Sequence, residues 1–373
     1  MPELALAAFF VLAYTYVGYP LLVGVLARLF PMRLREDAGF SPKVTAIVPL
    51  YNVEAYVEAK LESLLAQDWP ADKLEVLLYD DGSTDGTRAA AERVAARDAR
   101  VTVIAGPGRG GKPKGVNAML DRATGEVLLM TDARQPLVPG ALRALATRLA
   151  DPTVACVSGN LVLRGKGGAG AYWRYENWIR NQEAKFRGMV GVTGPIYAIR
   201  RADMAKLPDG IILDDMWVPM RLRLAGRRIV FAEGAIAYDD AFADAREYGR
   251  KVRTLAGNYQ LFSLLPRLLF PFSNPSWFET FSHKILRLVC PWALVVMLAA
   301  SGWAAWHPHM PFTALHVYAI RPLVGGQAAF YVLALLGPLA GRFGALARTF
   351  VVLNTAAVVG LYRFVTGRQK VTW

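Results

Sequence analysis

Residues Leu74 to Thr87 read LEVLLYDDGSTDGT, a strand-type run followed by a polar turn. Leu74 to Tyr79 is apolar and short, as in a buried strand, and the turn leads into a helix-type segment. The same alternation continues from Val44 to Ser158. Strands that alternate with helices indicate an α/β domain with a mainly parallel sheet covered on both faces.

The alternation gives the expected elements of this domain, which we place at residues 42–256. Strands are expected at 44–48, 74–79, 101–104, 127–130 and 154–158, and helices at 54–66, 84–99, 114–122 and 140–149. In parallel sheets, ligands bind beyond the carboxyl ends of the strands. That rule selects the polar residues after these strands as site candidates, namely Tyr51, Asn52, Asp80, Asp81, Lys112 and Asp132.

The start of the chain is apolar enough to enter a bilayer. Leu4 to Ala27 carries no charged side chain, and hydrophobic residues make up 54% of the sequence. No basic segment precedes this run, which favours a retained membrane anchor at residues 1–30 over a cleaved signal peptide. Arg28, Arg33 and Arg35 follow directly and predict that the next domain is cytosolic.

The C-terminal part is also apolar. Pro266, Pro271 and Pro275 break residues 257–284 into segments that suit the membrane interface. A transmembrane region of about three helices is expected at 285–373, with spans at 286–306, 317–339 and 346–364. Four crossings in all would leave the cationic tail outside, against the positive-inside rule, so the side of the C-terminus stays open.

The formal net charge is +13, so nucleic-acid binding must be considered. The cations cluster near the ends of the apolar segments, which suits lipid head groups and phosphates better than a nucleic-acid groove. No nucleic-acid-binding motif is present, and we predict no nucleic-acid partner. Cys156 and Cys290 lie far apart and form no metal-binding pattern.

The adjacent carboxylates Asp80 and Asp81 need a partner. Such a pair at a strand end is costly unless it binds a donor or a cation, for example a ring N–H of a nucleotide base. An alternative is a plain turn with a helix N-cap, which Ser, Thr and Asp also favour.

The surrounding motifs resemble those of family 2 glycosyltransferases, which have the GT-A fold of nucleotide-diphospho-sugar transferases. They are IVPLYN at 47–52, QDWP at 67–70 and DDGSTDGT at 80–87. The resemblance implies that Pro49, Tyr51 and Asp81 line a nucleotide pocket, with Asp80 adjoining. It also implies that Lys112, five residues before Asn117, contacts phosphate. A solvated loop lysine is the alternative.

The resemblance implies a divalent cation, Mg²⁺ or Mn²⁺, held by Asp132. Asp132 stands at the first position of the family's Asp-x-Asp metal motif, but Arg134 stands at the second. An arginine cannot ligate a metal, so Asp132 would bind the ion together with water and the diphosphate. A family subgroup is similar here and at Tyr172 to Glu176.

The resemblance also assigns the catalytic base. Asp214 and Asp215 precede Arg221 at the family spacing, so Asp215 matches the base and Asp214 the acid beside it. The alternative is a helix N-terminus that favours acids. Arg250 and Arg253 would share one helix face and contact the diphosphate, although a basic membrane-surface helix explains them too.

Together these features predict an inverting glycosyltransferase that takes a nucleotide-sugar, most simply a UDP-sugar. Its acceptor would be a glycan or a lipid-linked sugar, as in exopolysaccharide or cell-envelope synthesis, at the cytosolic face of a bacterial-type inner membrane and in contact with its lipids. Thr254, where polysaccharide synthases of the family have Trp, weakens the case for repeated addition. The rival hypothesis is a non-catalytic membrane protein that keeps the fold and binds a nucleotide-sugar.

Overall fold

The computed structural model describes residues 1–164, 168–240, 244–307 and 319–369. It confirms the expected α/β class with a mainly parallel sheet. The sheet has seven strands in the order β3-β2-β1-β4-β6-β5-β7. The strands are β1 (Val44–Leu50), β2 (Leu74–Asp80), β3 (Val101–Ala105), β4 (Val127–Thr131), β5 (Val154–Arg164), β6 (Ile196–Arg200) and β7 (Arg228–Asp240).

Both faces of the sheet are buried, which explains why its strands are apolar without interruption. Along β1, Val44, Ala46 and Val48 pack into one core, while Ile47 packs into the core on the opposite face. The helices between the strands are α3 (Glu54–Leu65), α4 (Thr87–Ala95), α5 (Lys112–Leu120) and α6 (Ala141–Leu149). They match the expected helices to within a few residues.

The strands β6 and β7 were missing from the sequence prediction. β6 pairs antiparallel with both β4 and β5, whereas β7 pairs parallel with β5. The alternation of strand and helix is interrupted here, because α7 (Gly168–Phe186) leads into β6 and α8 (Asp214–Leu224) lies between β6 and β7. The strand β6 enters the sheet from the carboxyl edge of its neighbours, and its preceding loop therefore lies at that edge.

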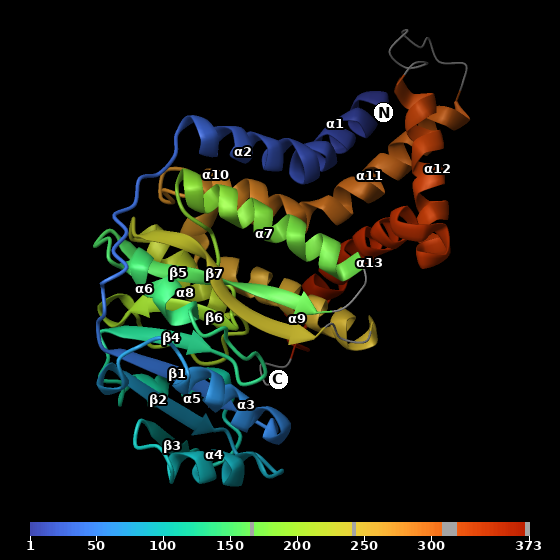
Figure 1. Cartoon of the computed structure of the whole chain (residues 1–373). Coiled ribbons are helices and arrows are strands. Elements are labelled where there is room, and N and C mark those ends of the chain that lie inside the picture. The colour runs from blue at the N-terminus through green and yellow to red at the C-terminus, as the bar shows by residue number, and fades with distance from the viewer. Residues whose placement is uncertain (165–167, 241–243, 308–318, 370–373) are drawn as a thin grey trace.

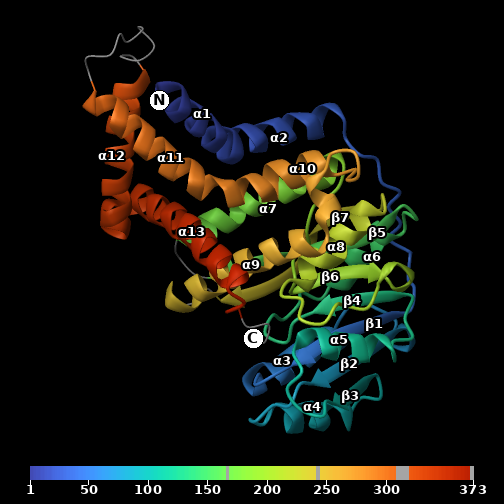
Figure 2. The ribbon, with the colours of Figure 1, turned by 180° about the vertical axis from the view of Figure 1, so that it is seen from behind.

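The apolar helices lie along one side of the α/β domain, beyond β5 and β7 and far from β3 (Figure 1). They are α1 (Pro2–Ala13), α2 (Tyr19–Leu29), α11 (Leu286–Trp306), α12 (Arg321–Leu336) and α13 (Gly341–Val365). From behind, α7 and α9 (Asp244–Leu264) lie between these helices and the sheet (Figure 2). The two helices therefore connect the α/β domain to the apolar part.

Three segments of the described chain are long and apolar enough to cross a membrane, namely Pro2–Leu29, Trp277–Trp306 and Arg321–Val365. The third of these contains two helices, α12 and α13, which the short turn Gly337–Ala340 separates. The expected spans at 286–306, 317–339 and 346–364 lie at the positions of α11, α12 and α13. The start of the expected span at 317–339 lies outside the described residues. The expected domain boundary after residue 256 falls inside α9, which ends at Leu264 before the proline-rich turns and α10 (Trp277–Thr280).

Candidate active site

The candidate site lies at the carboxyl edge of the central strands. In the parallel pairing of β1 with β2, Leu50 lies opposite Asp80, and the next amide, Asp81 N–H, donates to the Leu50 carbonyl at 2.9 Å. The strand β4 pairs with the other side of β1 and ends at Thr131, one residue before Asp132. The predicted residues Asp80, Asp81 and Asp132 therefore follow neighbouring strands at a single edge of the sheet.

The two adjacent aspartates organise the loops at this edge. The buried Asp81 carboxylate accepts hydrogen bonds from the amides of Gly110 (2.7 Å) and Gly111 (2.8 Å), and Asp80 accepts one from the Ser83 amide (3.1 Å). Gly82 has a φ of +75°, and a Cβ there would lie 3.0 Å from the loop backbone. The glycine after the acidic pair is thus required by the close approach of the two loops.

The expected nucleotide-pocket residues occupy different environments. Pro49 is buried inside β1, opposite Tyr79 of β2. Tyr51 is partly exposed, and the Arg109 guanidinium carbon lies 3.3 Å from the centre of its ring. The Gly-rich loop therefore covers the Tyr51 ring in this structure, and a stacked base would have to take the place of Arg109.

Lys112 is the charged centre of the site. Its ammonium lies 3.0 Å from Asp132 Oδ1 and 3.1 Å from Asp214 Oδ2. Burial lowers the pKa of Lys112, but the carboxylates around it outweigh burial and raise the pKa above its usual value. Likewise, burial raises the pKa of Asp132, but Lys112 outweighs it, so Asp132 has a pKa below its usual value. The Lys112 ammonium is thus held by two carboxylates of the site, and Lys112 is not a solvated loop lysine.

Asp214 and Asp215 form the first turn of α8, where the helix dipole favours negative charge. Burial, followed by the charge of Asp214, raises the pKa of Asp215 from 3.8 to about 6. Gly194, in the loop before β6, lies against this side chain, since a Cβ on it would be 2.9 Å from Asp215 Oδ2. A partly desolvated carboxylate with a pKa near 6 suits a general base at neutral pH.

Two buried groups at this edge were not predicted. The Lys60 ammonium donates to Thr131 Oγ1 (2.6 Å) and to the Gln135 carbonyl (2.7 Å), and burial lowers the pKa of Lys60 to about 7. Tyr197 of β6 is also buried, and burial together with the charge of Asp214 raises its pKa. One signal could have found Lys60, because the helical spacing of α3 places it on the apolar face.

The Arg134 side chain reaches across to β7. Its guanidinium pairs with Asp239 of β7 at 3.0 Å, and Gln135 Nε2 donates to the same carboxylate at 2.8 Å. The second position of the metal motif is thus used to connect the end of β4 to β7. This pairing gives a structural reason for the departure from Asp-x-Asp.

A divalent cation at this site would need ligands that the described residues do not supply. The described residues contain no group of three or more metal-type side chains. The Asp132 carboxylate is about one-quarter exposed (28%) and directs one of its oxygens to Lys112. Oxygen donors suit Mg²⁺ or Mn²⁺. Asp132 would therefore hold such an ion together with diphosphate oxygens and water.

The two arginines on α9 have different surroundings. Arg253 Nη2 donates to the Ile212 carbonyl at 3.2 Å, in the loop that leads to Asp214. Arg250 is exposed, one turn earlier on the same helix. Gln260, also on α9, accepts from the Ile212 amide at 2.9 Å and so helps to fix this loop. The helix α9 therefore supports the start of α8 as well as presenting cations.

His283 was given no role from the sequence, yet it lies at the centre of a buried polar network. Its Nδ1 is 2.6 Å from Glu183 Oε1 and its Nε2 is 3.2 Å from Glu176 Oε2. Tyr19 O–H donates to Glu183 at 2.6 Å, and Arg287 pairs with Glu176. This network connects α2, α7 and the start of α11.

Trp173 and Trp178, two tryptophans of α7, lie in different surroundings. Trp173 donates its indole N–H to the Leu161 carbonyl at 2.6 Å and lines a pocket beside α9. Trp178 packs against Gly24 of α2, where a Cβ would lie 3.1 Å from its ring. Only Trp173 of the pair therefore faces that pocket.

Comparisons with known proteins agree with this geometry. A sequence model described as Glycosyl transferase family 2 matches residues 45–207. Among solved structures, the fold is similar to that of the mannosyltransferase PcManGT from Pyrobaculum calidifontis, in complex with GDP-Man and Mn²⁺. Its TM-score is 0.76 and its identity 26%, over 98% of this chain and 99% of that chain. The chain therefore contains a glycosyltransferase domain of the GT-A fold. The match to glycosyltransferase family 2 covers residues 45–207, which is less than half of the chain.

Curated relatives share part of the chain. An N-acetylglucosaminyltransferase of Rhizobium meliloti (strain 1021) is 31% identical over 179 residues, which is 45% of this chain and 41% of that protein. A beta-monoglucosyldiacylglycerol synthase of Synechocystis sp. (strain ATCC 27184 / PCC 6803 / Kazusa) is 24% identical over 293 residues, 73% of this chain and 60% of that protein. The chain thus spans about two fifths of the first relative's length and three fifths of the second's.

Proposed function

We propose that this chain is an inverting glycosyltransferase that moves a sugar from a nucleotide-sugar, most simply a UDP-sugar, to a glycan or a lipid-linked acceptor. The observation that carries the proposal is the arrangement of Asp215, Lys112 and Asp132. It combines a carboxylate of raised pKa with a cation held beside a second carboxylate. Such a site offers a base for the acceptor and positive charge for a leaving diphosphate.

In the proposed reaction, Asp215 takes the proton from an acceptor hydroxyl. The hydroxyl oxygen forms a bond to the anomeric carbon as the bond from that carbon to the diphosphate breaks. The Lys112 ammonium, together with Arg253, stabilises the negative charge on the departing nucleoside diphosphate. A bound divalent cation would supply further charge neutralisation for that diphosphate.

The place of the reaction follows from the apolar helices. The three segments suited to a membrane lie on one side of the α/β domain, and Arg28, Arg33 and Arg35 follow the first of them. We propose that these cations, and the domain after them, lie on the cytosolic side of a bacterial-type inner membrane. The acceptor would then meet the site at the bilayer surface, in contact with membrane lipids.

The relatives support the proposal by the activities in their names. One is an N-acetylglucosaminyltransferase, one a beta-monoglucosyldiacylglycerol synthase, and PcManGT was solved with GDP-Man and Mn²⁺. Together they support a nucleotide-sugar donor, a divalent cation and a sugar or lipid acceptor for this chain. They also define the donors to test first.

The test is a donor panel on the purified full chain in detergent micelles with a membrane lipid extract as acceptor. UDP-GlcNAc, UDP-glucose, UDP-galactose and GDP-mannose are compared with Mg²⁺, Mn²⁺ or EDTA, and products are sized. We expect one donor to release its nucleoside diphosphate only when the acceptor is present. A single labelled product would indicate single addition, and a ladder would indicate repeated addition.

Asp132→Asn is the informative variant, and Asp72→Asn is its matched control, because Asp72 is exposed in the turn before β2. We expect a loss of turnover and of the response to Mn²⁺ for Asp132→Asn, and no change for Asp72→Asn. Tight nucleotide-sugar binding without turnover by the wild-type chain would instead support the non-catalytic binding protein.

A further inference from the structure

A second, charged pocket lies beside the candidate active site. It has a volume of about 160 Å³ and is lined by residues of α7, α9, α11 and α13, by His283 and Lys284 just before α11, and by Tyr16 between α1 and α2. Among the described residues that line it, Arg180, Lys251, Lys284 and Arg287 are cationic, whereas Glu176 is anionic. The excess of positive charge indicates that the pocket suits an anionic group.

The internal pairing leaves part of this charge unneutralised. Glu176 is already engaged, since it pairs with Arg287 and accepts from His283 at 3.2 Å. The Lys284 side chain is partly buried, and its ammonium makes no hydrogen bond or ion pair within the described part of the chain. A half-buried ammonium without a partner is costly, so an anion in the pocket would be stabilised strongly.

Arg180 connects the pocket to the catalytic carboxylate. Its guanidinium donates to Thr193 Oγ1 at 3.3 Å and lies over the Trp173 ring at 5.2 Å. Thr193 is followed by Gly194, the residue in contact with Asp215. Arg180 therefore lies between this pocket and Asp215, the proposed base.

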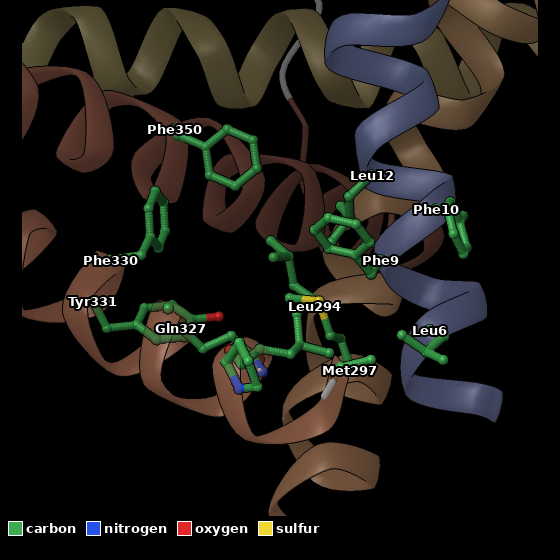
Figure 3. Close-up of a pocket in the computed structure, with 14 residues that line it drawn as sticks. Leu6, Phe9, Phe10, Leu12, Leu294, Met297, Gln327, Phe330, Tyr331 and Phe350 are labelled. Carbon is green, nitrogen blue, oxygen red and sulfur yellow. Dashed lines mark hydrogen bonds between the residues drawn. The ribbon is translucent and has the colours of Figure 1, made fainter. Parts of the chain in front are cut away.

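On its other side the pocket meets a large apolar cavity. This cavity has a volume of about 770 Å³ and lies between α1, α11, α12 and α13, with Phe330 and Phe350 on one wall and Phe9 and Leu12 on another (Figure 3). Tyr16, which lines the charged pocket, contacts Phe350 edge-to-face at 4.8 Å. The charged and apolar spaces are thus adjacent, and the rings of Tyr16 and Phe350 lie at their boundary.

We propose that these two spaces bind one molecule, an acceptor lipid that carries a phosphate between its hydrocarbon chain and its acceptor hydroxyl. The phosphate lies among Lys284, Arg180 and Arg287, and the chain lies in the apolar cavity. The hydroxyl then extends past Arg180 to Asp215. This inference rests on the proposed function, because it names the class of acceptor for that reaction.

The first experiment measures lipid binding, independently of turnover. The full chain in detergent micelles is mixed with phosphatidylglycerol, a polyprenyl-diphosphate-linked sugar or diacylglycerol, and binding is followed by native mass spectrometry. Both phosphate lipids share the required chemistry, and diacylglycerol is the neutral control. We expect binding of at least one phosphate lipid in clear preference to diacylglycerol. Equal binding of diacylglycerol would overturn the proposal.

The variant pair for this assay is Lys284→Gln with Lys43→Gln as the matched control, because Lys43 is exposed just before β1. Loss of one charge-assisted hydrogen bond predicts about 10- to 100-fold weaker phosphate-lipid binding for Lys284→Gln. Lys43→Gln should bind as the wild type does, and both variants should keep the wild-type affinity for the donor. Equal lipid binding by the two variants would overturn the proposal.

A second variant keeps the test decisive if Lys284→Gln does not fold. Leu294→Trp fills the apolar cavity without changing its charge. We expect this variant to weaken the binding of a phosphate lipid with long hydrocarbon chains, but not of an analogue of the same lipid with short chains. No effect on either ligand would contradict the inference.

Turnover with each lipid then shows which of the two phosphate lipids is the acceptor. It also distinguishes a failure of the lipid-site proposal from a failure of the proposed function. Transfer to phosphatidylglycerol identifies a glycerophospholipid acceptor, and transfer to the polyprenyl-diphosphate-linked sugar identifies a lipid-linked glycan. Phosphate-lipid binding that needs Lys284, without transfer of sugar to any acceptor, would refute the proposed function and leave the lipid site standing. Sugar transfer that Lys284→Gln does not change would refute the lipid site and leave the proposed function standing.

Discussion

Replacing Asp215 by asparagine removes the proposed base while keeping the size and polarity of the side chain. A positioned general base contributes about 10²- to 10⁴-fold to a rate, so we expect a loss of that size in sugar transfer. Donor binding should stay within about twofold of wild type, because Lys112 and Asp132 are unchanged. Turnover is measured as nucleoside diphosphate release, and donor binding by calorimetry on the same preparations.

The pH dependence of the wild-type enzyme gives a sharper test. The pKa of Asp215 is raised to about 6, so roughly 0.9 of its carboxylates are ionised at pH 7 and roughly 0.1 at pH 5. We therefore expect the transfer rate to fall about tenfold over that interval. A carboxylate with the ordinary value of 3.8 would stay more than about nine-tenths ionised at pH 5 and show almost no loss.

The same shift predicts the sign of the stability change. Because the folded-state pKa of Asp215 lies above its unfolded value, the group favours folding below pH 3.8 and loses that contribution as pH rises through 6. The full shift corresponds to about 3 kcal/mol, or about 2 kcal/mol allowing for partial exposure. Asp215→Asn should thus be more stable than wild type at pH 7.5, by roughly 4–8 °C in Tm.

This gain in stability should shrink as the pH falls through 6, where the wild-type carboxyl becomes protonated. Thermal unfolding in detergent at pH 5 and at pH 7.5 measures both values. Asp215→Glu is the control, because it keeps a carboxylate at this position. Asp215 is not the base if the transfer rate falls near pH 4 instead of pH 6, or if Asp215→Asn keeps most of the turnover. A lower stability of Asp215→Asn than of wild type at neutral pH would contradict the raised pKa of Asp215.

Three further predictions concern neighbours of this site. Gly194→Ala places a Cβ 2.9 Å from Asp215 Oδ2, and we expect kcat to fall about 10- to 100-fold with donor affinity retained, as measured by initial rates and calorimetry. Lys112→Met leaves two carboxylates without their cation and should lower the free energy of unfolding by roughly 3 kcal/mol in a urea titration, whereas Lys112→Arg should recover most of it. Asp239→Asn releases Arg134 and should lower Tm by roughly 2–6 °C; an unchanged Tm would show that the Arg134 pair contributes nothing to stability.

The central part of the fold could be predicted because its strands are buried on both faces. Five of the strands appear in the sequence as short apolar runs between helices of ordinary spacing. The strands β6 and β7 escaped prediction for a different reason. β6 is short and antiparallel, and β7 follows α8 in a part of the chain where the regular alternation has stopped. The membrane-type segments were clear from their apolar runs, and the break between α12 and α13 falls at the glycine-containing turn Gly337–Ala340.

The site divides in the same way. By its own local pattern, the sequence determined which residues follow the strands, and its resemblance to family 2 glycosyltransferases singled out Asp215 and Lys112. Only the tertiary structure decided which charges meet. It brings Lys112 between Asp132 and Asp214, pairs Arg134 with Asp239 and buries His283 between two glutamates from α7. Those contacts join residues far apart in the chain. They depend on strand order, helix docking and side-chain rotamers, which local patterns of hydrophobicity and charge do not encode.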